Sequence, residues 1–290
     1  MTTVAVALDA GGSKIAGGLV TLGGEVSTER RVATEGDGVE QTAALARDLA
    51  AAALAGGLEV AGVGAGFPEY VDAAGRLTSD EVLNWSAQPR DLLAAAVPGA
   101  PVRVESDVRC GALAEAQLGA GRGLDSLLYV TLGTGLSSSL VIDGHPHAGH
   151  RGEAIALGEL DADVPGWPGN LEDHCSGRGV CERYEELTGV GVDEARTLMQ
   201  LAADGDDAAV ALLESAGVSL GSAIGGLVAV LDPQAVVLGG GLGSAAGPLR
   251  DALDRAYGAR AERRPSPPPI VTARLGPRAG LVGAGLLVFH

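Results

Sequence analysis

A glycine-rich turn near the start of the sequence contains the residue types that bind phosphate. Residues 8–18 read LDAGGSKIAGG and follow the apolar run of residues 4–8. Glycines at the tip of a hairpin let phosphate oxygens approach the backbone N–H groups without a Cβ in the way. The sequence predicts that this turn binds phosphate, through Asp9, Gly11, Gly12, Ser13 and Lys14.

Lys14 is the only lysine among 20 basic side chains. A coding bias toward arginine that left one lysine by chance would explain this, and so would a ligand contact at the turn. The composition does not choose between the two.

A second glycine turn, Gly133–Gly135, repeats the pattern of the first. It joins the expected strands 126–131 and 136–142, as the first turn joins 4–8 and 15–20. Its tip, which includes Thr134, would hold phosphates from the other side. The glycines that follow the expected strand 235–238 are a candidate adenosine site. They are Gly239, Gly240 and Gly241. Together the three segments predict a nucleotide cleft.

The sequence context argues against other nucleotide-binding motifs. The run at 119–123 follows an expected helix and precedes a strand, which is the wrong order for a dinucleotide site. No glycine loop ends in the GK[ST] of a Walker motif. Residues 241–246 fit the dinucleotide-binding pattern G-x-G-x-x-A. However, the next strand ends in Arg274 and offers no acidic residue to bind the ribose. A helix start packed closely on a strand is the alternative there.

The length, composition and charge limit which classes of protein this chain can belong to. The chain has 290 residues, 46% of them hydrophobic and 3% aromatic, which suits one large or two ordinary domains with a core of Ala, Val and Leu. The net charge of −17 argues against binding nucleic acid or an anionic membrane. Gly and Ser interrupt the longest apolar stretch, 216–231, and three cysteines make no disulfide framework. We expect a soluble cytoplasmic protein.

Asp107 ends the expected strand VRVESD and precedes an expected helix through GALAEAQLGAG. A carboxylate at a strand end can orient an attacking hydroxyl and accept its proton. The alternative is an N-cap for a helix that begins at Val108. The residues alone favour neither interpretation.

The sequence resembles the ROK family (repressor, open reading frame, kinase) of sugar kinases, within the actin-like ATPase superfamily. The resemblance covers residues 4–288 in family order. Its segments are LDAGGSK, GFPEYVDAAG, VESD, YVTLGTGLSSSLVIDG, GEL, LDPQAVVLGGG and LGPRAGLVGAG.

The resemblance implies an α/β, two-domain actin-like ATPase (ribonuclease H-like) fold with the active site in the interdomain cleft. The smaller domain would be 1–108 plus 277–290, and the larger 109–276. ATP would donate its γ-phosphoryl group to a hydroxyl, at C6, of glucose or a related amino or N-acetyl hexose. Asp9 would act on Mg²⁺ through water and Asp107 would be the catalytic base. By analogy with the family, we expect a homodimer.

The resemblance also assigns the sugar pocket, with departures. Glu159 and Glu172 match the family's sugar-binding glutamates, although each would otherwise be a solvated loop acid. Ser106 replaces an Asn that usually precedes the catalytic Asp, and Glu81 lies where another sugar-contacting Asn is common. An altered pocket, and with it an altered substrate, is expected.

The family's zinc motif, C-x-C-G-x-x-G-C with a His shortly after the GE pair, is degenerate in this chain. Ala162 stands where that His would be, and Cys175 and Cys181 are too few for the motif. Four ligands with sensible spacing are not found, so zinc is not expected.

Two rival functions stay open. ROK repressors share the same core, but they carry a DNA-binding helix-turn-helix ahead of it, and here the phosphate turn begins at Asp9. The acidic charge also opposes DNA binding. The second rival is a kinase-like protein that binds nucleotide without catalysis. We predict an ATP-dependent hexose kinase.

Overall fold

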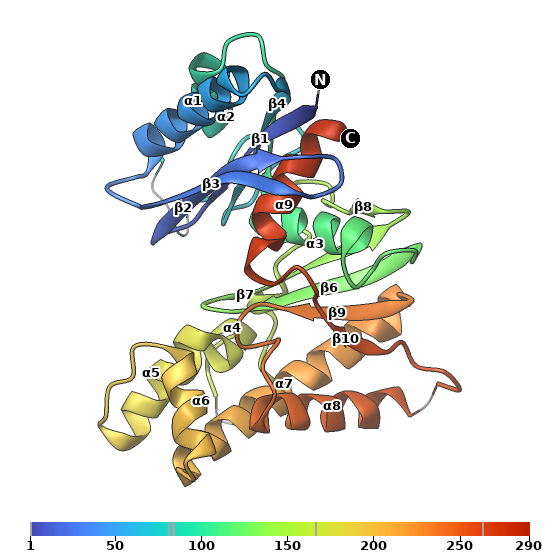
Figure 1. Cartoon of the computed structure of the whole chain (residues 1–290). Coiled ribbons are helices and arrows are strands. Elements are labelled where there is room, and N and C mark those ends of the chain that lie inside the picture. The colour runs from blue at the N-terminus through green and yellow to red at the C-terminus, as the bar shows by residue number, and fades with distance from the viewer. Residues whose placement is uncertain (1, 81, 83–84, 166, 263) are drawn as a thin grey trace. The chain divides into compact units, whose positions relative to one another are not determined.

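The structure is a computed structural model, which describes residues 2–80, 82, 85–165, 167–262 and 264–290. Its contacts divide the chain into two compact units (Figure 1). Unit 1 comprises Met1–Gly123, Ser139–Ile155 and Pro277–His290, and unit 2 comprises Leu124–Ser138 and Ala156–Gly276. The domain boundary expected between 108 and 109 stays a prediction.

The sheet of unit 1 has the strand order β3-β2-β1-β4-β5. Strand β1 pairs antiparallel with β2 and parallel with β4, and β4 pairs parallel with β5. The bounds are β1 Thr3–Ala10, β2 Lys14–Val20, β3 Val26–Ala33, β4 Glu59–Phe67 and β5 Val102–Ser106. The helices are α1 Val39–Ala55, α2 Pro89–Ala96, α3 Asp107–Leu118 and α9 Ala279–Leu286. Strands β1 and β2 confirm the strands expected at 4–8 and 15–20, and α3 confirms the helix expected through GALAEAQLGAG; the strand expected over VRVESD ends one residue earlier, at Ser106.

Both faces of this sheet are covered by helices (Figure 1). Val6 and Leu8 of β1 join one core cluster with Leu49 of α1. Ala7, which points to the opposite face, joins another cluster with Leu281 of α9. A strand buried on both faces is apolar throughout rather than alternating, which explains the run at residues 4–8.

Glycine lets α9 pack directly on α3. A Cβ on Gly283 would overlap the backbone carbonyl of Cys110.

We expect Gly283→Ala to lower the free energy of unfolding by about 1–3 kcal/mol, because the backbone would have to move. Gly258, inside helix α8 (Pro248–Ala261) of unit 2, has open space at its Cβ position. Gly258→Ala is therefore the control and should raise stability by up to about 1 kcal/mol. Chemical denaturation of both variants measures the difference, and equal effects would contradict the packing argument.

The second sheet has the order β10-β9-β6-β7-β8, and β6 and β10 run parallel to β9. The unit division falls within β7. The strands are β6 Ser126–Leu132, β7 Leu136–Ile142, β8 His145–Pro146, β9 Ala235–Gly239 and β10 Ile270–Thr272. The helices of unit 2 are α4 Leu171–Cys175, α5 Gly177–Thr188, α6 Ala195–Ala203, α7 Asp207–Leu231 and α8 Pro248–Ala261. Short 3₁₀ turns lie at Leu157–Glu159, Gly276–Arg278 and Leu287–Phe289.

Helix α7 forms much of the core of unit 2. Its 25 residues have the length and hydropathy of a membrane-crossing helix, but half of its apolar window is buried within the protein. Cβ atoms on Gly217 and Gly221 would overlap the backbone carbonyls of Leu249 and Leu253. The glycines therefore allow close packing of α7 on α8, which makes α7 a core helix.

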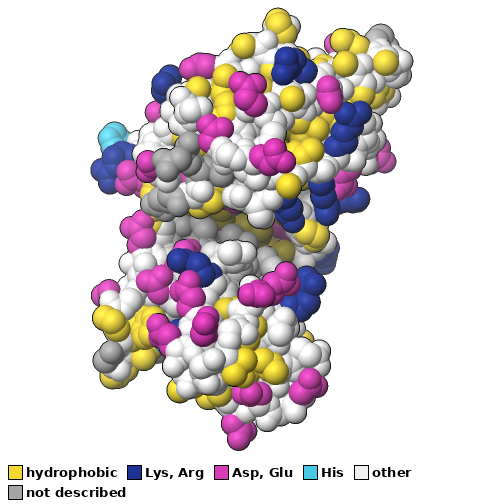
Figure 2. All heavy atoms as spheres, turned by 90° about the vertical axis from the view of Figure 1, so that its left-hand side faces the viewer, with side chains coloured by type: hydrophobic (Ala, Val, Ile, Leu, Met, Phe, Trp, Pro, Cys, Tyr) yellow, Lys and Arg dark blue, Asp and Glu magenta, His cyan; other side chains and the backbone are white. Residues whose placement is uncertain are grey.

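Acidic side chains are spread over the surface. On the face drawn in Figure 2, Asp and Glu lie over much of the surface, with Lys and Arg between them, in keeping with the net charge of −17.

Candidate functional site

Unit 1 brings three carboxylates to one edge of its sheet. Asp9 lies near the end of β1, Glu69 follows β4, and Asp107 follows β5 as the first residue of α3. Strands β1, β4 and β5 are parallel, with Asp9 opposite Gly66, so their carboxyl ends meet at the same edge. Burial, the Asp9 charge and the Glu69 charge raise the pKa of Asp107 to about 7, against the effect of a hydrogen bond from Val108.

The N-cap interpretation of Asp107 is not supported. Helix α3 begins at Asp107 with Ser106 in the N-cap position, and no side chain makes a cap hydrogen bond. Asp107 instead accepts a 2.6 Å hydrogen bond at Oδ1 from the N–H of Val108. The carboxylate is partly buried and lies near the charges of Asp9 and Glu69.

Ser106 is 1% exposed, and its hydroxyl has no hydrogen-bond partner among the described residues. A buried hydroxyl without a partner costs free energy, which a hydrogen bond from a bound ligand would offset. Glu69 is also buried, and it accepts hydrogen bonds from Ser79 Oγ at 2.5 Å and Val82 N at 2.9 Å.

Asp9 is the carboxylate predicted to act on Mg²⁺. Burial raises its pKa and the Lys14 charge opposes that effect. A Cβ on Gly280, in the first turn of α9, would lie 2.9 Å from Asp9 Oδ2, so glycine allows this close approach. Among the described residues no group of three or more His, Cys, Asp or Glu is arranged to hold a metal. Mg²⁺ often keeps its waters and takes only one or two carboxylates, so Asp9 fits a water-mediated contact.

The first predicted phosphate turn, Gly11–Lys14, is held by its own backbone and by Thr34. The N–H of Gly11 donates to the carbonyl of Lys14 at 2.9 Å. Thr34 donates its N–H to Ser13 O at 3.1 Å and its hydroxyl to Gly11 O at 2.7 Å. Lys14 is exposed at the start of β2. The turn is thus held by hydrogen bonds within unit 1, and the Gly11 N–H is already used in one of them.

In unit 2, the first turn of α5 holds the second predicted phosphate turn, Gly133–Gly135. Gly177 N donates to Gly133 O at 2.7 Å and Arg178 N donates to Thr134 O at 3.2 Å. Gly133 N donates to Gly135 O at 2.9 Å, which closes the turn.

Glu172 is attached to this same turn. Its Oε2 accepts from Leu136 N at 2.8 Å, and its Oε1 accepts from Arg178 Nη2 at 3.1 Å. A Cβ on Gly158 would lie 2.9 Å from the Glu172 Cβ. The 3₁₀ turn that ends in exposed Glu159 therefore lies beside Glu172. Unit 2 brings together the two glutamates and the glycine turn, and both Glu172 oxygens already have partners.

The glycines after β9 pack on the end of β6. A Cβ on Gly240, whose φ is +80°, would overlap the Leu132 carbonyl, which also accepts from Leu242 N at 3.0 Å. Gly241 has open space at its Cβ position. Helix α8 begins at Pro248, directly after the run 239–247, and residues 241–244 form a turn before it.

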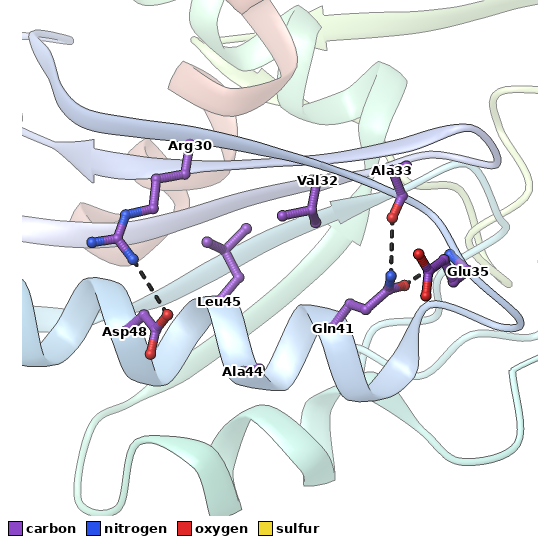
Figure 3. A pocket seen from close by; sticks show the side chains of 8 residues that line it. All are labelled: Arg30, Val32, Ala33, Glu35, Gln41, Ala44, Leu45 and Asp48. Atoms are coloured by element: carbon purple, nitrogen blue, oxygen red, sulfur yellow. Dashed lines mark hydrogen bonds and ion pairs between the residues drawn. The ribbon is translucent and has the colours of Figure 1, made fainter.

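Other predicted residues lie elsewhere. Glu81 lies outside the described residues. All three cysteines are buried, and Cys175 donates from Sγ to Ala216 O at 3.2 Å. A hollow of about 520 Å³ in unit 1 lies between β3 and α1, with the Arg30–Asp48 ion pair at one end (Figure 3). None of the three carboxylates lines it.

No sequence motif assigns a role to Glu69, although it lies in the segment GFPEYVDAAG. The signal that could have found it is topological. A residue that follows a strand parallel to β1 must emerge at the edge where Asp9 lies.

Comparison with known proteins identifies the family. The ROK family model matches residues 5–290. A glucokinase of Streptomyces coelicolor is 28% identical over 96% of this chain and 95% of its own length. An N-acetyl-D-glucosamine kinase of Haemophilus influenzae is 32% identical over 79% of this chain and 81% of its own length. The bifunctional enzyme NanE/NanK of Brucella melitensis is 37% identical over 64% of this chain, which spans 35% of that protein's length.

Solved structures that resemble this chain also belong to ROK proteins. The ROK hexokinase of Thermus thermophilus superimposes with a TM-score of 0.87 at 34% identity, over 99% of this chain and 98% of that one. A ROK glucokinase of Streptomyces griseus, crystallised with glucose and AMPPNP, gives 0.79 at 28% identity, over 97% and 98%. The expected fold class is confirmed. The chain belongs to the ROK family and has the α/β, actin-like ATPase fold of its sugar kinases.

Proposed function

We propose that this chain is an ATP-dependent sugar kinase that phosphorylates a hydroxyl, at C6, of glucose or a related amino or N-acetyl hexose. The observation that carries the proposal is the partly buried Asp107 beside Asp9 and Glu69. Membership of a family that includes named glucokinases and N-acetylhexosamine kinases supports it.

Asp107 acts as the base in this proposal. The sugar hydroxyl oxygen attacks the γ-phosphorus, the bond to the β–γ bridging oxygen breaks, and ADP leaves. Asp107 orients the hydroxyl and takes its proton late in the transfer. In the ligand-free chain its pKa of about 7 suits proton acceptance near neutral pH. Mg²⁺, held through water by Asp9, would neutralise charge on the phosphates.

The other predicted residues divide between nucleotide and sugar. We assign phosphates to the turns at Gly11–Lys14 and Gly133–Gly135, and adenosine to Gly239–Gly241. We assign the sugar to Ser106, Glu159 and Glu172, where Ser106 offers a buried hydroxyl without a partner among the described residues. Glu172 would have to share its carboxylate with the turn that it anchors.

Lys14 provides a test of the nucleotide assignment. We expect Lys14→Ala to weaken ATP binding by about tenfold or more, because a hydrogen bond to a charged group contributes about 1.5–3 kcal/mol. Isothermal titration with a non-hydrolysable ATP analogue measures this, and Lys14→Arg should bind more tightly than Lys14→Ala because it keeps the charge. An unchanged dissociation constant in Lys14→Ala would leave the lone lysine without a role in binding.

An ADP-release assay over a panel of hexoses, aminosugars and N-acetyl sugars tests the activity. We expect one or a few sugars to stimulate ADP release strongly. Nucleotide binding without sugar-dependent turnover would instead favour the inactive, kinase-like alternative. Sugar binding without nucleotide binding would favour a sensor.

We also propose a homodimer in the cytoplasm, by analogy with the family. Sedimentation equilibrium would show a mass near twice the 28.8 kDa of the chain. A single species of monomer mass would contradict the dimer.

A further inference from the structure

Arg109 is a completely buried cation in the first turn of α3, two residues after Asp107. A buried charge is costly unless it is paired and its donors are satisfied. The Nε of Arg109 donates to Glu105 Oε1 at 2.6 Å, and Nη2 lies 2.5 Å from the same oxygen. Glu105 therefore neutralises the charge at close range.

The outer nitrogens of Arg109 contact two distant segments of unit 1. Nη1 donates to the carbonyl of Gly152 at 2.8 Å, and Nη2 donates to the carbonyl of Val71 at 2.6 Å. The two segments also contact each other, since a Cβ on Gly152 would overlap the Val71 carbonyl and the Gly152 φ of +87° favours glycine. One side chain thus joins three parts of the chain at the start of α3.

The Val71 segment adjoins the carboxylates at the edge of the unit 1 sheet. Glu69, one of the three, lies two residues before Val71, and Asp107 lies two residues before Arg109. The contacts of Arg109 are therefore next to the carboxylates of the proposed acceptor side rather than at the turn Gly11–Lys14.

We propose that Arg109 is a positioning residue for the sugar acceptor, whose planar fork fixes the backbone of Val71 and Gly152 relative to Asp107. The inference rests on the proposed kinase function. Lysine cannot replace this arrangement, because an ammonium is a compact charge without the fork that reaches two carbonyls and a carboxylate together.

The double variant Glu105→Gln, Arg109→Gln tests the proposal. It removes both charges, so no unpaired ion is left in the interior, and such exchanges of buried ion pairs are often tolerated. We expect the KM for the sugar to rise about tenfold while the KM for ATP stays within about twofold, a difference of about 1.4 kcal/mol. Hydrogen exchange should become faster at 70–78 and 148–154. Arg109→Lys, which keeps the charge, should give the same KM split and serves if the double variant fails to fold.

Leu49→Ala is the matched control, because Leu49 lies in the core of the same unit and contributes only packing. It should lower stability without moving either KM or the exchange of the two segments. An active wild-type enzyme whose variants keep the wild-type sugar KM would overturn the role of Arg109 alone. A wild-type protein that phosphorylates no sugar would overturn the proposed function and this inference with it.

Discussion

Asp107→Asn should give a protein that folds more stably than the wild type and transfers almost no phosphate. The stability gain follows from linkage. Burial and the Asp9 and Glu69 charges raise the pKa of Asp107 from 3.8 to about 7 in the folded ligand-free chain. At pH 8 the folded wild type must keep the Asp107 carboxylate ionised in a buried site near the charges of Asp9 and Glu69. A neutral amide at this position should raise the free energy of unfolding by up to about 4 kcal/mol.

The pH dependence distinguishes this gain from improved packing. Because the folded pKa is the higher one, the destabilisation of the wild type is absent below about pH 4 and complete above about pH 7. Urea denaturation of both proteins at pH 4 and pH 8 should therefore show a gain only at pH 8. A gain of equal size at both values would contradict the charge argument. Turnover should fall about 10³-fold, within the range for loss of a general base, while ATP binding stays near normal.

His174→Gln should remove much of the acid sensitivity of unit 2. His174 is 1% exposed, its Nε2 lies 3.0 Å from Ser215 Oγ, and the Trp167 ring packs against it. Burial and the Arg183 charge lower its pKa from 6.5 to about 4. The folded state therefore favours the neutral ring.

The direction in which stability changes with pH follows from proton binding. Between about pH 6.5 and pH 4 the unfolded chain binds a proton that the folded chain does not, so stability falls as the pH falls through this range. The shift corresponds to about 3 kcal/mol. Chemical denaturation at pH 7 and pH 4 should show a smaller loss in His174→Gln than in the wild type. His150→Gln, at an exposed position, is the control, and equal losses in all three proteins would contradict the account.

Local pattern was sufficient to predict much of the fold. The apolar runs at 4–8 and 126–131, followed by glycine turns, predict β1 and β6, because a strand buried on both faces has few polar residues. The pair Asp143–Gly144 is typical of a two-residue hairpin turn, and both residues have the positive φ that such a turn requires, of 51° and 76°.

Contacts between distant segments were not predictable. Arg109 reaches Val71 and Gly152, which lie 38 and 43 residues away in the chain. Nothing in the local sequence specifies such partners, because they depend on how loops return to the start of α3. Glu172 illustrates the same limit, since its attachment to Leu136 depends on the path of the chain between them.

The most direct test of the account is ³¹P NMR of the wild-type protein with ATP, Mg²⁺ and each sugar that stimulates ADP release, beside Asp107→Asn under the same conditions. The account predicts a sugar phosphate signal that grows in step with ADP in the wild type and is absent over the same time in the variant. ATP consumed without a sugar phosphate, or a variant that forms the product at the wild-type rate, would contradict it.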